Sequence, residues 1–176
     1  MGHDDSATAA ELGRGQVITA ILLAWLLSVG FDFLLHGGLL ADAYRAEHPA
    51  LLEPAEAFRR VPLGYATFLV LTVALWWLLA RLQVRGWLAG ARLGLLAGLL
   101  VWGALAVGLY SITTLGAGLL TGWWVGQGAE LALAGAVLGA ARAGVGLRRI
   151  GWRVGAAFLL LVAATIALQS LAGPTH

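Results

Sequence analysis

Ser28, Asp32 and His36 follow one another at intervals of four residues, near the end of an apolar run from Val17 to Leu40. On a helix this spacing places the three side chains in one stripe along one face. A carboxylate and an imidazole are costly in hydrocarbon, so we expect them to face a bundle interior, a partner or a water-filled cavity. Hydrogen bonding between helices, ligand or proton binding, and metal ligation are all open to these residue types.

Further polar groups are expected at a similar depth on other helices. Tyr110 lies near the end of one apolar run, and Gln127 and Glu130 lie within the next. The topology derived below places them in the same half of the membrane as Asp32 and His36. We therefore predict a polar cluster or ligand-binding site that consists of Ser28, Asp32, His36, Tyr110, Gln127 and Glu130.

Two carboxylates and one imidazole could hold a hard or borderline cation, so Asp32, His36 and Glu130 are candidate metal ligands. A lone intramembrane histidine can also ligate the metal of a haem or chlorophyll-type pigment. A pigment, quinone, lipid or metal near His36 is accordingly the candidate cofactor. The chain has no Cys, which excludes thiolate metal sites and a thiol nucleophile. It also has no P-loop, dinucleotide-binding glycine pattern or nucleophile elbow, so we expect a non-catalytic protein rather than an enzyme.

The elements that position these residues follow from composition. Of the 176 residues, 60% are hydrophobic and only 11% are charged, and the mean hydropathy is +0.86. These values are typical of an integral membrane protein. The apolar blocks are continuous and lack the alternation of barrel strands, so the spans must be helices, which satisfy their own backbone groups. The basic residues lie mainly in short loops, which argues for membrane topology and against nucleic-acid binding.

We predict an all-α polytopic membrane protein with a polar tail at residues 1–15 and a single domain at 16–176. The domain is a bundle of about five transmembrane helices, at residues 16–40, 61–80, 88–111, 121–141 and 152–171. The Gly37-Gly38 pair is expected to loosen the last turn of the first helix. Within the first external loop, Pro54 is expected to begin a short interfacial helix.

The distribution of arginine predicts the orientation. With five spans, the amino-terminal tail and the second and fourth loops lie on one side, and they hold Arg14, Arg81, Arg85, Arg92, Arg142, Arg148, Arg149 and Arg153. The opposite side holds Arg45, Arg59 and Arg60. The positive-inside rule then predicts a multi-pass protein of the cell inner membrane, with a cytoplasmic amino terminus and an external carboxyl terminus.

Small residues recur at four-residue intervals in two of the predicted helices. They are Gly94 and Gly98 in one helix, and Gly122, Gly126, Gly135 and Gly139 in the other. Such pairs allow close helix packing in membranes. They favour an accessory or structural subunit of a larger energy-converting or pigment-containing complex, or a homo-oligomer. The alternative is a stand-alone protein that binds or transports a small ligand, a proton or a metal ion through the Asp32, His36 and Glu130 cluster.

The segment from Phe31 to Leu40, followed by Asp42 and Tyr44, has an acid, a His-Gly pair and a later tyrosine. It resembles the first-helix signature of small uncharacterised bacterial membrane proteins. The resemblance covers roughly the first 45 residues. It implies a polytopic helical fold and draws attention to Asp32, His36 and Tyr44, but it implies no reaction.

Overall fold

The computed structural model describes residues 12–45 and 50–171, and these residues form helices without any strand. Most of the predicted polar tail, together with His3, His48 and His176, lies outside the described residues. In chain order the elements are α1 (Arg14–Leu34), the π-helical turn η1 (Leu35–Leu39), α2 (Ala41–Arg45), α3 (Pro54–Arg81), α4 (Trp87–Ile112), α5 (Ala117–Arg142) and α6 (Leu147–Leu171).

Within the described residues, four helical segments are long and apolar enough to cross a membrane. They cover Arg14–Leu39, Ala55–Arg81, Trp87–Ile112 and Leu147–Leu171. The prediction of an all-α polytopic membrane protein is therefore confirmed. The predicted span at 121–141 corresponds to α5, which is equally long but is not among the four. Gln127 and Glu130 lower the hydropathy of α5. Its composition alone therefore does not predict a membrane span, and its position depends on packing against the other helices.

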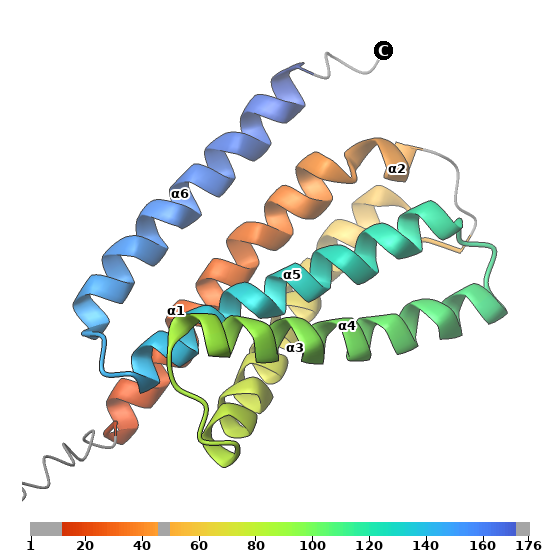
Figure 1. Ribbon diagram of the computed structural model, residues 1–176. Coiled ribbons are helices and arrows are strands. Elements are labelled where there is room, and N and C mark those ends of the chain that lie inside the picture. The colour runs from red at the N-terminus through yellow and green to blue at the C-terminus, as the bar shows by residue number, and fades with distance from the viewer. Residues whose placement is uncertain (1–11, 46–49, 172–176) are drawn as a thin grey trace, which may run out of the picture.

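The helix α5 occupies the centre of the bundle. It packs along α4 on one side and along α1 on the other, and α6 lies against the far side of α1 (Figure 1). Both polar residues Gln127 and Glu130 are almost fully buried on α5. Neighbouring helices thus shield the two polar side chains of α5 from lipid, and this shielding removes much of their cost.

Close packing of α4 on α5 depends on glycine. A Cβ atom at Gly94 would collide with the carbonyl oxygen of Leu131, and one at Gly90 would collide with that of Gly135. Because both obstacles are backbone atoms, they cannot move aside as a flexible side chain would. The predicted packing glycines 98, 135 and 139 also face backbone atoms of the opposite helix, and the glycines at 122 and 126 face Leu40 and Leu35. These small-residue faces are therefore occupied within the chain.

The short interfacial helix expected from Pro54 is not a separate element. Pro54 begins α3, and the helix continues through Pro62 without a break to Arg81. Proline is tolerated in the first turn because the amide it lacks would have no intrahelical partner there. The segment expected on the membrane surface is therefore the first turns of a long helix, and the short helix that the loop does contain is α2.

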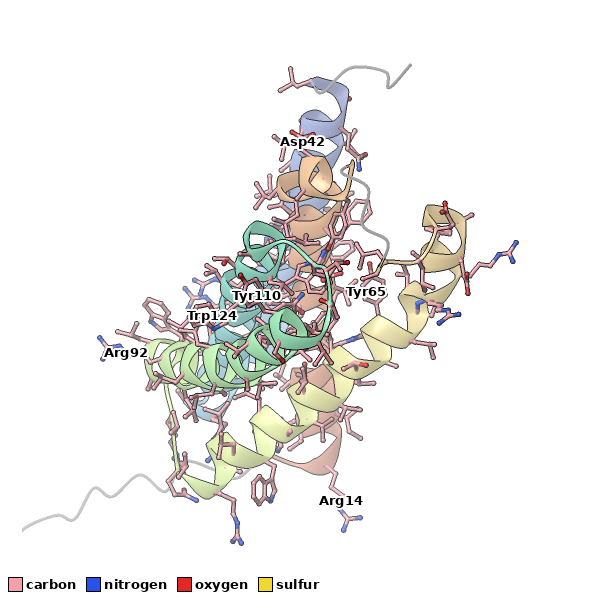
Figure 2. The ribbon with its side chains drawn as sticks, turned by 90° about the vertical axis from the view of Figure 1, so that its right-hand side faces the viewer. Arg14, Asp42, Tyr65, Arg92, Tyr110 and Trp124 are labelled. Atoms are coloured by element: carbon pink, nitrogen blue, oxygen red, sulfur yellow. The ribbon has the colours of Figure 1, made fainter. Side chains whose placement is uncertain are left out.

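The two ends of the bundle differ in charge. The starts of α1, α4 and α6 and the ends of α3 and α5 lie together, and we call this the arginine end because Arg14, Arg81, Arg85, Arg92, Arg142, Arg148, Arg149 and Arg153 are near it. The opposite end carries α2 and the start of α3. In Figure 2, Arg14 and Asp42 mark these opposite ends.

Candidate functional site

The helix that carries Asp32 and His36 changes its pitch at His36. The turn η1 covers Leu35–Leu39 and closes with a bond of 2.8 Å from the Leu40 amide to the Leu35 carbonyl, five residues earlier. Gly37 and Gly38 lie within this turn, where the sequence predicts a loosened helix. Single π-helical turns are frequent at functional sites. Here the turn is followed by α2, which returns the chain over His36.

Tyr44, on α2, makes the first contact of the site. Its hydroxyl lies 2.6 Å from His36 Nδ1, and it accepts a hydrogen bond of 2.5 Å from Trp123 Nε1. The three rings also lie close together, with the His36 and Tyr44 centroids 5.7 Å apart. Burial raises the pKa of Tyr44 to about 12, although the hydrogen bond from Trp123 opposes this shift. The phenol therefore keeps its hydrogen over the physiological range.

This pattern assigns the hydrogens on His36. An indole N–H can only donate, so Tyr44 accepts the Trp123 bond, and Asp32 Oδ1 at 3.2 Å from Nε2 favours the tautomer in which Tyr44 donates to His36 Nδ1. A neutral imidazole then carries its hydrogen on Nε2. That nitrogen lies 3.2 Å from Asp32 Oδ1, to which it donates. Tyr44 and Trp123 thus fix both the orientation and the tautomer of His36.

Asp32 receives a second hydrogen bond from α5. Gln127 Nε2 donates to the same Oδ1 atom at 3.3 Å. With the His36 hydrogen on Nε2, the 3.2 Å contact between Gln127 Nε2 and His36 Nε2 joins two donors and is not a hydrogen bond. Two side-chain donors therefore converge on one carboxylate oxygen and fix its orientation beside the cavity.

A cavity of about 520 Å³ opens beside this carboxylate, within the range of about 300–1,000 Å³ for small-molecule sites. Its walls come from α1, α3, α4 and α5. The residues that line it are Asp32, Phe33, His36, Gly37, Phe58, Val61, Gly64, Tyr65, Phe68, Trp102, Trp123 and Gln127. Six of these twelve are Phe, Tyr or Trp, and neither Arg nor Lys is among these described residues.

The first half of α3 forms the outer wall of this cavity. Figure 2 shows that this half of α3 leans away from the other helices, with Tyr65 on the side that faces them. Trp25 Nε1 donates to the Tyr65 carbonyl at 2.8 Å and ties α3 to α1 at this level. Phe58 is 77% exposed. The Trp25–Tyr65 contact therefore fixes one boundary of the cavity, and the cavity opens to the outside past the exposed start of α3.

Two buried polar atoms of the lining residues lack a hydrogen-bond partner among the described residues: Gln127 Oε1 and Trp102 Nε1. Gln127 is only 3% exposed. A buried acceptor or donor without a partner costs about 1–3 kcal/mol. Both atoms are buried within the wall rather than exposed on the cavity surface.

The remaining predicted site residues lie elsewhere. Ser28 and Glu130 are each 1% exposed and do not line the cavity. Within the described chain, Ser28 Oγ and Glu130 Oε2 have no partner. Tyr110 is 64% exposed on α4 and is also absent from the lining. Of the six predicted residues, the structure brings together Asp32, His36 and Gln127.

The predicted metal triad is not assembled. Across residues 12–45 and 50–171, no three His, Cys, Asp or Glu side chains are grouped closely enough to hold a metal ion. Glu130 lies one turn beyond Gln127 on α5, and Gln127 rather than Glu130 contacts Asp32. Both ring nitrogens of His36 already take part in polar contacts. Ligation of a metal or a pigment would have to break one of these contacts.

Sequence reasoning missed most of the cavity wall. The aromatic residues of α3 are not at positions that set them apart from other apolar residues of that helix. Trp123 and Trp102 were not separated from ordinary interfacial or core tryptophans. The His36–Tyr44 pair had a local signal in the Gly37-Gly38 sequence and in the resemblance noted above.

No protein-family model, curated protein or solved structure matches this chain. The resemblance of the first helix therefore stays a sequence observation, and the function has to be argued from the site itself.

Proposed function

We propose that the protein is a stand-alone membrane protein that binds a small, lipophilic organic cation in the cavity beside Asp32. The observation that carries the proposal is the pairing of the Asp32 carboxylate with an aromatic wall that has no Arg or Lys among its described residues. Aromatic rings attract cations through their negative faces, by about 0.5–2 kcal/mol for each good contact. The Asp32 carboxylate and the aromatic rings therefore both favour a positively charged ligand.

The hydrogen-bond pattern supports a ligand that is positive at one end. Asp32 is an acceptor in the cavity lining, and the nearest donors, on His36 and Gln127, are already directed at it. A charged ligand that donates to a carboxylate gains about 1.5–3 kcal/mol from one such bond.

The packing of the glycine faces bears on the other predicted function. An accessory subunit of a larger complex was expected to use these faces, yet α4 and α5 use theirs against each other and against α1. The subunit role stays a prediction, and native mass spectrometry in mild detergent tests it. Co-release of stoichiometric partner chains would support that role and count against a stand-alone protein.

Two probes of almost equal shape test the ligand class. Phenethylammonium carries a positive charge with N–H donors, and propylbenzene is its neutral isostere. We expect titration calorimetry on the full chain in detergent to detect binding of the cation, and Asp32→Asn to weaken it about 10- to 100-fold. Binding of the neutral isostere should change little. Equal binding of the two probes to the unmodified protein would refute a cation site.

Two matched controls guard against indirect effects. Glu56→Gln removes an exposed carboxylate that is ion-paired with Arg60 at the same end of the bundle, and it should leave cation binding unchanged. Glu53→Gln changes an exposed carboxyl at the start of α3 that is outside the cavity lining, and it should also have little effect on cation binding. If Asp32→Asn does not fold, Phe68→Leu removes one aromatic face and should weaken the cation more than its isostere. Equal losses for both probes would contradict the cation–π contribution.

A further inference from the structure

A second cavity, of about 330 Å³, lies toward the arginine end between α5 and α6. Its residues are Leu27 from α1, Trp87 from α4, Ala136, Val137 and Ala140 from α5, Val145 from the connection, and Ile150, Arg153, Val154 and Ala157 from α6. Nine of these ten are apolar. Arg153 is the single charged residue among the described residues that line this space, which we call the α5–α6 groove.

The groove exists because α5 and α6 pack on α1 rather than on each other. Figure 1 shows α1 alongside both helices, with α6 on the far side of α1 from α4. Alanines at 136, 140 and 157 leave the space between α5 and α6 unfilled, and Leu27 forms its floor. An apolar recess of this kind, open at the side of a membrane bundle, suits a hydrocarbon chain.

One end of the groove lies at the depth of the lipid headgroups. Trp87 is 64% exposed and begins α4, and exposed tryptophans at helix ends are typical of the membrane interface. Arg153 is one turn after Arg149 on α6, so both guanidinium groups lie on one face of that helix. A headgroup seated beside Trp87 would meet both arginines.

The charges at this end are not balanced within the described chain. From residue 61 to residue 171 the sequence holds seven arginines and one carboxyl group, that of Glu130, which is buried on α5. The Glu56–Arg60 ion pair lies at the opposite end. Arg142 is turned toward the Val84 carbonyl, at 2.9 Å, and the Trp76 ring. Arg149 and Arg153 are thus available to an external anion.

We propose that the α5–α6 groove binds one anionic phospholipid, with an acyl chain between α5 and α6 and the phosphate at Arg149 and Arg153. Basic residues near a membrane surface attract anionic lipids by about fivefold in affinity for each residue. The apolar recess also fixes the position of the acyl chain, which a basic surface alone would not do. This binding site is separate from the cavity beside Asp32 and does not depend on the ligand proposed there.

Native mass spectrometry of the full chain, with phosphatidylglycerol or phosphatidylcholine of identical chains added in detergent, tests the proposal. We expect one retained phosphatidylglycerol with at least tenfold preference over phosphatidylcholine. Arg149→Gln combined with Arg153→Gln should abolish most or all of that preference, at about fivefold for each arginine. Arg92→Gln removes a charge on α4, outside the groove lining, and is the matched control that should leave the preference in place.

Further measurements distinguish lipid binding in the groove from attraction by the arginine charges alone. Ala157→Leu narrows the groove without changing charge and should lower retention of both lipids severalfold. Inorganic phosphate at millimolar concentration should not displace the retained lipid. The proposal would be overturned by equal retention of the two lipids, by equal effects of Arg92→Gln and the double variant, or by displacement with phosphate. Retention that rises after removal of residues 1–11 would instead assign the groove to the acidic amino-terminal residues of the chain.

Discussion

The hydroxyl of Tyr44 lies 2.6 Å from Nδ1 of His36, eight residues earlier in the chain. Eight residues of continuous α-helix would separate two positions by about 12 Å along the axis. The π-helical turn at Leu35–Leu39 and the short helix α2 remove that separation. His36 is therefore held by a residue outside the membrane-spanning segment, and through His36 so is Asp32.

Replacement of Tyr44 with Phe should release His36. The variant loses the donor to His36 Nδ1 and the acceptor for Trp123, so we expect a loss of about 1–3 kcal/mol in stability. The imidazole hydrogen should also redistribute between its two nitrogens, and this is visible in ¹⁵N NMR spectra of histidine-labelled protein. Tyr110→Phe is the matched control, because Tyr110 is exposed and outside the site. Unchanged histidine shifts in Tyr44→Phe would show that Tyr44 does not set the tautomer.

Stability at alkaline pH should depend on Tyr44. Burial raises the pKa of this phenol from 10.0 to about 12, so the folded state holds the proton more tightly than the unfolded state. The stabilisation is fully present below pH 10 and is lost as the pH rises to about 12. Thermal melts between pH 9 and 12 should therefore show a steeper decline for the unmodified protein than for Tyr44→Phe. Parallel declines would argue that Tyr44 ionises equally in both states.

The contact between α4 and α5 should not tolerate even one methyl group at Gly94. A Cβ atom there meets the Leu131 carbonyl oxygen, so Gly94→Ala has to force the helices apart and should cost about 1–3 kcal/mol. Gly108→Ala changes the same helix where nothing lies within 4 Å of the new atom, and it should be neutral or slightly stabilising. Reversible unfolding in mixed micelles compares the two. Equal stabilities would mean that the helices do not pack as closely as the structure shows.

Much of the fold could be predicted from the sequence. Long apolar runs predict membrane helices because hydropathy adds up locally, residue by residue, and does not depend on which helices become neighbours. Helices cover the five predicted ranges to within a few residues at most ends, and four of these helices are long and apolar enough to cross a membrane. The prediction divided the helix that starts at Pro54 into a short interfacial helix and a span at 61–80. The interior proline, Pro62, is accommodated within α3.

The site was predictable only in part, because depth in the membrane can be read from sequence and direction around a helix cannot. Asp32 and His36 share a face through the helical period alone, and that pairing is present. Gln127, Glu130 and Tyr110 were all expected at a similar depth, yet only Gln127 meets Asp32. Which face of α5 turns toward α1 is decided by the packing of Gly122 and Gly126 on Leu40 and Leu35.

By itself, the sequence determined the membrane class, the helical architecture and the polar stripe on the first helix, since each follows from local composition and the helical repeat. The tertiary structure decided which residues complete the site. It placed Tyr44 and Trp123 on His36, and it placed the aromatic residues of α3 opposite Asp32. These contacts join helices far apart in the chain, and they depend on interhelical packing that no local pattern encodes.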